Sequence, residues 1–198
     1  MTAPREEKWD ALRRKALAQL ENHKLEGRVD ADIVWLLDLI NSSPNYYTTS
    51  SCSGRIQVVA GRHPGEKGKL RVLAKWHRTI TPEDLWVVMD ATDEDSVWLS
   101  VHPPIIHVVA RDMNSARRLL VTARNSGFKH SGIQGLGRRI VIEVMSMEKI
   151  EAPLRLGGVE VIAPEKYPLL VSAANELLLR GKSRLNRLAE AFTRSGTV

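Results

Sequence analysis

The apolar positions of the chain repeat with helical spacing in five stretches. Residues three or four apart, such as Trp9, Leu12, Ala16 and Leu20, predict a first helix that ends near His23. The same spacing predicts helices after Asp30, Thr81 and Asp112, three side chains suited to capping a helix N-terminus. A last helical region is predicted to begin at Pro164, with Gly181 as a weak point.

Short runs rich in β-branched and apolar residues fill the intervals between these helices. They predict strands at 46–51, 55–62, 70–77, 96–101, 105–110, 140–147, 151–156 and 159–162. Helices, a hairpin, strands around a helix, a second hairpin and a long helix follow one another along the chain. This order predicts an α+β fold, with a mixed or antiparallel sheet flanked by helices. Residues 1–198 are expected to form a single domain because no linker interrupts them.

Phosphate-binding glycine motifs are missing from the positions where a nucleotide fold needs them. The run 132–137 has the spacing Gly-x-x-Gly-x-Gly, but it precedes a predicted strand instead of opening a helix. We interpret it as a hairpin turn, so the sequence carries no Rossmann fingerprint. Binding of an adenosyl cofactor by another fold stays open.

The positive charges of the chain are segregated. The net charge is +6, and residues 55–78 hold seven Lys or Arg against one acid, whereas 79–101 hold six acids and no Lys or Arg. Residues 111–139 again hold seven basic residues against Asp112 alone. Such clustering indicates a polyanionic partner, with nucleic acid the leading candidate, although chance clustering on a solvated surface accounts for the charge pattern about as well.

Cysteine usage and hydropathy indicate the cellular location that we expect for the protein. The chain has one cysteine, Cys52, so no internal disulfide and no cysteine-based metal site is expected. Its first residues carry mixed charges without an apolar core, and its apolar runs are too short to cross a bilayer. A cytoplasmic protein without a membrane partner is therefore expected, and its oligomeric state stays open.

The most unusual stretch is the run Tyr46 to Arg55, which reads YYTTSSCSGR. Five hydroxyl groups of Ser and Thr, one thiol and one guanidinium stand side by side here. A hydroxyl-rich turn, with Cys52 as a small buried residue, explains the run taken by itself. A site for anionic ligands is favoured by the basic segment that Arg55 opens.

Several motifs in a fixed order resemble a known family, the tRNA wybutosine-synthesizing methyltransferases. They are GRVDADIV at 27–34, the run 46–55, His77, IHVVARD at 106–112, GFKHSGI at 127–133 and IEAPL at 150–154. The resemblance spans about residues 9–192. Some relatives carry a second cysteine after the histidine that matches His77; this chain lacks it, so no two-cysteine mechanism is expected.

The resemblance implies a methyl transfer from S-adenosyl-L-methionine to a modified guanosine. The implied acceptor is N4 of 7-(3-amino-3-carboxypropyl)-4-demethylwyosine at position 37, in the anticodon loop of phenylalanine tRNA. A non-catalytic protein that binds the anticodon loop is the alternative. A hydrolase that depends on Cys52 is disfavoured, because no base and acid are paired with this thiol in the sequence.

The site residues follow from the motif match and the chemistry of each side chain. His77 is the predicted catalytic base, although a surface or capping role explains it equally well. The predicted cofactor-binding or substrate-binding residues are Ser50, Ser51, Cys52, Ser53, Gly54, Arg55, Lys75, Trp76, Arg111, Ser131 and Gly132. Packing in the hairpin is the favoured role of Trp76, and His107 is interpreted as a core histidine. No residue is predicted to bind a metal.

Overall fold

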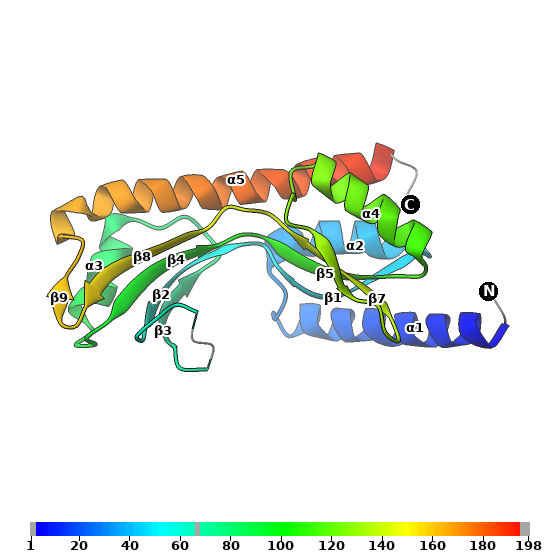
Figure 1. Cartoon of the computed structure of the whole chain (residues 1–198), viewed down its shortest axis with the longest axis horizontal. Coiled ribbons are helices and arrows are strands. Elements are labelled where there is room, and N and C mark those ends of the chain that lie inside the picture. Colours follow the sequence, from blue (N-terminus) through cyan, green and yellow to red (C-terminus); the bar gives the residue numbers. More distant parts are fainter. Residues whose placement is uncertain (1–2, 66–67, 195–198) are drawn as a thin grey trace. The chain divides into compact units, whose positions relative to one another are not determined.

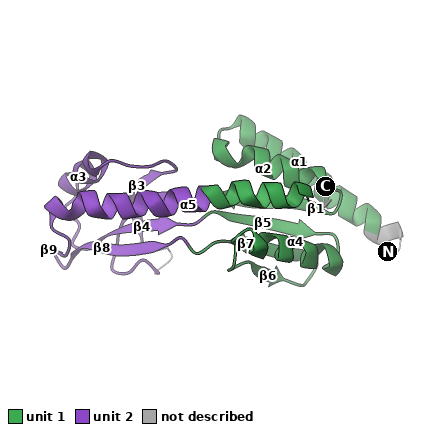
Figure 2. Cartoon of the chain, turned by 90° about the horizontal axis from the view of Figure 1, so that it is seen from above, with its two compact units in different colours: residues 1–53, 104–147, 183–198 green, residues 54–103, 148–182 purple. Residues whose placement is uncertain are grey.

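The computed structural model describes residues 3–65 and 68–194, with the side chains of residues 3–5 left aside. The chain divides into two compact units (Figure 2). Unit 1 contains residues 1–53, 104–147 and 183–198, and unit 2 contains residues 54–103 and 148–182. The expectation of a single domain over 1–198 stays a prediction.

Unit 1 is built on a four-stranded antiparallel sheet. The strand order is β1 (Tyr46–Cys52), β5 (Ile105–Ala110), β7 (Ile140–Met145) and β6 (Gly132–Gly135). Helix α1 (Ala3–Leu25) lies on one side of this sheet, and α2 (Val34–Ser42) and α4 (Met113–Asn125) lie on the other (Figure 1). A 3₁₀ turn, η1 (Ala31–Ile33), precedes α2, and the last turns of α5 (Tyr167–Arg194) complete the unit.

Alternation along the strands of unit 1 separates two apolar clusters. Ile106 and Val108 of β5 point into the main core with α2, α4 and the end of α5. Val109 points the other way and packs with Tyr47 and Trp9 under α1. Because successive side chains of a strand face opposite sides, one strand serves both clusters. Both faces of the sheet are therefore covered by helices.

Unit 2 contains a five-stranded antiparallel sheet. The order is β3 (Arg71–Trp76), β2 (Arg55–Ala60), β4 (Val97–His102), β8 (Ile150–Leu156) and β9 (Val159–Glu160). Helix α3 (Pro82–Asp90), the turn η2 (Pro164–Lys166) and the first part of α5 belong to the same unit. Ile56, Val58 and Leu99 of the strands pack with Leu85 of α3 and Tyr167 of α5.

Two of the three predicted helix caps are confirmed. Thr81 and Asp84 form a reciprocal capping box at α3, and the Asp112 carboxylate accepts the Ser115 backbone N–H at α4 over 2.7 Å. For Asp30 only the position is confirmed, because it is the N-cap residue of η1, the turn that leads into α2. Asp30 makes no side-chain cap bond, and its carboxylate instead accepts the backbone N–H of Ser53 over 2.8 Å. This bond holds the end of the hydroxyl-rich run.

The predicted fold class is confirmed, with every strand pairing antiparallel. Two local expectations fail. Residues 132–135 form strand β6 instead of a turn, because they pair with β7, and the turn lies at 136–139. Gly181 does not interrupt α5, which continues to Arg194. None of the described helices is both long and apolar enough to cross a membrane.

Candidate functional site

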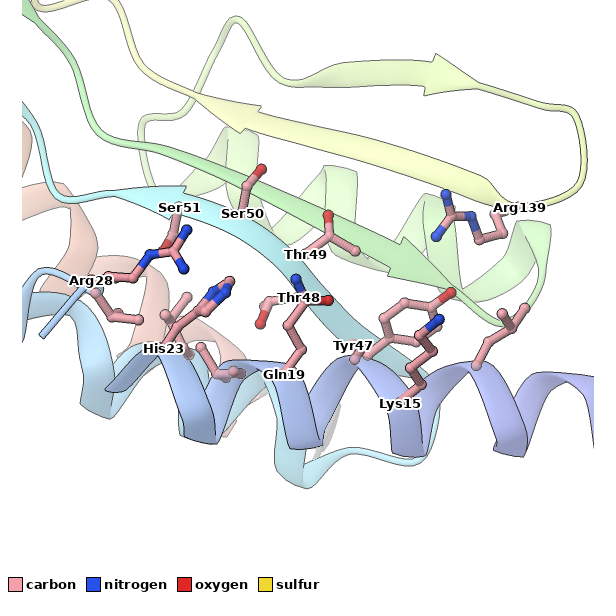
Figure 3. Close-up of a pocket in the computed structure, with 15 residues that line it drawn as sticks. Lys15, Gln19, His23, Arg28, Tyr47, Thr48, Thr49, Ser50, Ser51 and Arg139 are labelled. Carbon is pink, nitrogen blue, oxygen red and sulfur yellow. The ribbon is translucent and has the colours of Figure 1, made fainter. Parts of the chain in front are cut away.

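A pocket of about 450 Å³ opens between α1 and β1 in unit 1 (Figure 3). Its size is in the range of small-molecule sites in proteins. Two hydrogen bonds fasten α1 over the start of β1: Trp9 Nε1 donates to the Pro44 carbonyl over 3.2 Å, and Arg13 Nε donates to the Tyr46 carbonyl over 3.2 Å. The sequence places these residues one helical turn apart, so both face the sheet.

The lining of this pocket combines apolar side chains with cations and hydroxyl groups. Its apolar lining residues are Leu12, Ala16, Leu20, Val29 and Leu37. Its polar lining residues are Lys15, Gln19, His23, Arg28, Tyr47, Thr48, Thr49, Ser50, Ser51 and Arg139. No acid is among them. The pocket therefore suits a ligand with a flat apolar part and negative charge.

The cations of the pocket lie toward two ends. In Figure 3 Lys15, Gln19 and His23 project from α1 toward β1, with Arg139 near the Lys15 end and Arg28 near the His23 end. Lys15 and His23 are two helical turns apart, which is about 12 Å along the axis. Two anionic groups of a ligand can thus be bound some distance apart, with hydroxyl groups between them.

Tyr47 is the most deeply buried polar group of the pocket. The residue is 1% exposed, and its ring packs against that of Trp9 at a tilt of 49°, with the ring centroids 5.1 Å apart. Its hydroxyl has no hydrogen-bond partner among the described residues. A buried hydroxyl without a partner costs free energy, so this group is available to a ligand or a water molecule.

A bulge in β1 sets which hydroxyl groups face the pocket. Tyr47 pairs with Val109 and Thr48 with Val108, but the next residue of β5, His107, pairs with Ser50. Thr49 is the extra residue. Because of it, Tyr47 and Ser50 point to the same face although they are three positions apart. Thr48 points inward, and its hydroxyl accepts from the Asn41 amide over 2.8 Å.

Ser50 begins a row of polar side chains that crosses three strands. Its Oγ lies 2.9 Å from Nδ1 of His107 on β5, and Nε2 of His107 lies 3.2 Å from Oε2 of Glu143 on β7. Gln134 of β6 donates to Oε1 of Glu143 over 2.9 Å. The register places Ser50 directly opposite His107, and His107 directly opposite Glu143. We refer to Ser50, His107 and Glu143 as the unit 1 row.

The geometry of the unit 1 row selects one tautomer of its histidine. A carboxylate can only accept, so the nearby Glu143 favours a proton on Nε2 of His107. Nδ1 is then the acceptor for the Ser50 hydroxyl. His107 keeps 29% of its side-chain surface exposed, and Glu143 keeps 17%. The expectation that His107 is a core histidine is therefore wrong: His107 is half-buried, and it contacts the Ser50 hydroxyl that lines the pocket.

Arg111, a predicted ligand, lines a second hollow of about 170 Å³ in unit 1. Lys8, Arg138 and Arg139 line the same hollow. Arg111 donates to Glu6 over 3.0 Å, while its buried Nε has no partner among the described residues. Since Arg139 lines both hollows, the basic surface continues from one to the other.

The remaining predicted residues of unit 1 lie outside the pocket. Cys52 is half-buried at the end of β1, and Ser53 is fully buried. The Ser131 side chain is buried and its hydroxyl accepts the Met145 backbone N–H over 3.2 Å, and Gly132 opens β6. Of the predicted set, the pocket brings together Ser50 and Ser51. Ligand contacts by the others stay predictions.

The other predicted residues belong to unit 2. Gly54 joins β1 to β2 with a φ of 95°, a conformation that favours glycine. Arg55 opens β2, Lys75 and Trp76 end β3, and His77 follows it. Lys75 is exposed and Trp76 packs on the core of unit 2, which agrees with its favoured packing role. The catalytic role of His77 stays a prediction.

A second polar row lies on the sheet of unit 2. Arg55 Nε donates to the Gln57 amide oxygen over 3.0 Å, and the Gln57 amide nitrogen lies 3.0 Å from Nε2 of His102. Burial lowers the pKa of His102, and the positive charges of Arg55 and Lys149 lower it further. We refer to Arg55, Gln57 and His102 as the unit 2 row.

Nearly the whole chain is similar to known proteins. The family model for methyltransferase TYW3 matches residues 11–194. The chain belongs to this family. It is therefore a methyltransferase, as the motif order predicted. The match covers α2, β1 and the unit 1 row, and thus the candidate site itself.

Named relatives come from archaea. A protein of Thermococcus sibiricus is 39% identical over 93% of this chain and 94% of its own length, and one of Archaeoglobus fulgidus is 39% identical over 93% of each. Both are named tRNA(Phe) 7-((3-amino-3-carboxypropyl)-4-demethylwyosine(37)-N(4))-methyltransferase. This TYW3-family chain thus aligns with nearly the full length of both relatives.

Solved structures carry the same fold. The PH1069 protein from Pyrococcus horikoshii superposes with a TM-score of 0.89 at 34% identity, over 93% of this chain and 96% of that one. A hypothetical protein from Aeropyrum pernix superposes with a TM-score of 0.77 at 29% identity, over 85% of this chain and 100% of that one. This TYW3-family chain therefore shares its fold with both solved structures.

Proposed function

We propose that this protein methylates N4 of 7-(3-amino-3-carboxypropyl)-4-demethylwyosine at position 37 of phenylalanine tRNA. The observation that carries this proposal is the 39% identity, over 93% of the chain, to relatives named for that reaction. A cytoplasmic location accompanies the proposal, because tRNA is its substrate. The anticodon loop is the part of the tRNA that the site must receive.

S-adenosyl-L-methionine is the proposed methyl donor: it supplies a methyl group on a sulfonium, and the C–S bond breaks as the ring nitrogen forms the new N–C bond. The pocket of unit 1 fits such a ligand set, since it pairs an apolar lining with cations and hydroxyl groups. Arg28 and His23 would hold the carboxylate of the donor, and Ser51 would form a hydrogen bond with a hydroxyl group of the donor.

The opposite end of the pocket suits the RNA. Lys15 and Arg139 would contact phosphate, and the apolar residues between the two ends would pack against a flat base turned out of its stack. Arg55 belongs to unit 2 and is a separate candidate for binding a carboxylate, either of the amino-carboxypropyl arm or of the donor, because a guanidinium can bind a carboxylate with two hydrogen bonds.

The experiment combines the purified protein, phenylalanine tRNA from a strain that stops before this step, and donor labelled in its methyl group. We expect label in the tricyclic base at position 37, identified by mass spectrometry of the digested tRNA. tRNA binding without donor binding or incorporation would overturn the proposal and favour the non-catalytic alternative.

A further inference from the structure

We propose that the unit 1 row accepts the proton that the target nitrogen loses, with Ser50 as the group that contacts the substrate. This inference rests on the proposed function and deepens it. Methylation of a ring N–H releases one proton, and the reaction requires a group that receives it. His77 was the sequence candidate for this task. The unit 1 row offers a second, complete arrangement.

The geometry of the row supports a directed proton path. Ser50 lines the pocket and is exposed, so a ligand can reach its Oγ. Behind it, Nδ1 of His107 lies 2.9 Å from that oxygen. Both the distance and the tautomer allow Ser50 to donate its proton to His107 as it accepts one from the substrate.

Glu143 completes the path by stabilising the charge that forms. When His107 holds a second proton it becomes a cation, and Oε2 of Glu143 lies 3.2 Å from its other ring nitrogen. The carboxylate is mostly covered, which strengthens its attraction for that cation. Gln134 fixes the carboxylate from the neighbouring strand. Glu143 and Gln134 are thus positioning residues.

The balance of the step is simple. The proton on N4 moves to Oγ of Ser50, and the proton of Ser50 moves to Nδ1 of His107, so the hydroxyl is regenerated. No bond to the enzyme forms, because a nitrogen lone pair attacks the methyl group directly. Ser50 is therefore a relay rather than a covalent nucleophile, which distinguishes the row from the triad of serine hydrolases.

The alignment of the row depends on the bulge at Thr49. In a regular strand Tyr47 and Ser50 would point to opposite faces, and Ser50 would be directed toward the core. The bulge brings Ser50 onto the face of His107. Bulges occur frequently beside active sites, where they redirect a side chain.

The first test measures single-turnover methylation by the full-length protein with saturating tRNA and labelled donor. Ser50→Ala and His107→Gln should each slow the chemical step by about 10²-fold or more while the tRNA dissociation constant stays within twofold. The double variant should be no slower than His107→Gln, because both residues serve one path. His130→Gln, an exposed histidine after α4, is the matched control and should stay within twofold of wild type.

The second test determines the tautomer of His107 without measuring catalysis. Nitrogen-15 NMR of labelled histidine should show His107 with its proton on Nε2, and Glu143→Gln should give a mixture of tautomers. Single variants at His107 and His102 assign the signals. A His107 protonated on Nδ1, or full chemical rates for Ser50→Ala and His107→Gln, would overturn the inference. Absence of any methylation by wild type would instead refute the proposed function, and the NMR result would remain interpretable.

Discussion

Each unit of the protein carries one histidine in a polar row on its sheet, and the two rows create opposite environments. His107 of unit 1 lies between a hydroxyl and a carboxylate. His102 of unit 2 contacts an amide and is surrounded by the charges of Arg55 and Lys149. The first environment gives the imidazole ring a hydrogen-bond partner on each nitrogen, whereas burial and the two cations of the second lower the pKa of His102.

The difference teaches how the surroundings of a histidine, more than the residue type, assign its task. Burial and, after it, the cations Arg55 and Lys149 lower the pKa of His102, so this side chain stays neutral at physiological pH and serves as a hydrogen-bonding group. The carboxylate beside His107 instead compensates the charge that a proton transfer creates. The surroundings of His107 therefore fit the proposed proton transfer, and those of His102 fit a neutral hydrogen-bonding group.

Reversing the charge at Glu143 should have the largest effect, because it would give His107 the cationic surroundings of His102. Glu143→Lys should lower the chemical rate by about 10²-fold or more, since the imidazolium would lose its partner and gain a like charge. Single-turnover kinetics measure this. Glu190→Lys makes the same change on an exposed position of α5 and should leave the rate within twofold. Equal rates for Glu143→Lys and Glu190→Lys would contradict the role given to the carboxylate beside His107.

Removing the charge of Arg55 tests the other row. Arg55→Ala should lower kcat/KM by about tenfold to a hundredfold, because a hydrogen bond from a charged group contributes about 1.5–3 kcal/mol. Lys69→Ala should mainly weaken tRNA binding and flatten its salt dependence. Lys67, for which the sequence predicts the same behaviour, lies outside the described residues. The tautomer of His107 should be unchanged in Arg55→Ala; a changed tautomer would show that the rows are not independent.

The cations of the pocket separate binding from chemistry. Lys15→Gln and Arg139→Gln should each reduce the slope of log K against log salt by about one and weaken tRNA binding a few-fold. Fluorescence titrations at several salt concentrations give the slope. Lys166 is an exposed lysine of η2, and Lys166→Gln is the control. If Lys166→Gln reduced the salt slope as much as Lys15→Gln and Arg139→Gln do, the pocket would not be part of the RNA interface.

The smallest expected effect is on stability as a function of pH. The folded state lowers the pKa of His102 below its usual 6.5, so the unfolded chain binds this proton first as the pH falls. Stability is consequently lost as the pH falls through about 6.5, and His102→Gln should lose less of it. Urea unfolding at pH 7.5 and pH 5.5 measures the difference. If the stability of His102→Gln depended on pH as steeply as that of wild type, or more steeply, the lowered pKa of His102 would not be the origin of the loss.

Much of the fold was predictable because local signals agreed with the tertiary structure. The capping box at Thr81 and the cap at Asp112 require only neighbours in sequence, and both were predicted. Asp30 stands at the predicted N-cap position, but its side-chain bond was mispredicted because its partner, the Ser53 N–H, is distant in sequence. Likewise, strand β6 was taken for a turn because its glycines do not reveal their pairing with β7.

The candidate site was predictable only in part. The hydroxyl-rich run indicated Ser50 and Ser51, which line the pocket. The contribution of α1 was missed because Lys15, Gln19 and His23 look like an ordinary solvated helix face. His107 and Glu143 were missed because each lies in an apolar strand, and only strand pairing reveals that they are neighbours. A charged residue in such a strand, opposite a histidine, is the signal that could have found them.

The extra residue in β1 also bears on the robustness of the site. Thr49 carries a hydroxyl group as Ser50 does, and it would stand opposite His107 if the bulge moved by one position to Ser50. A shift in register usually exchanges a functional side chain for an unrelated one. Here the exchange would still present a hydroxyl group. The redundancy of the run therefore protects the chemistry against small errors in alignment, and it gives insertions and deletions at this point a milder outcome than elsewhere in the sheet.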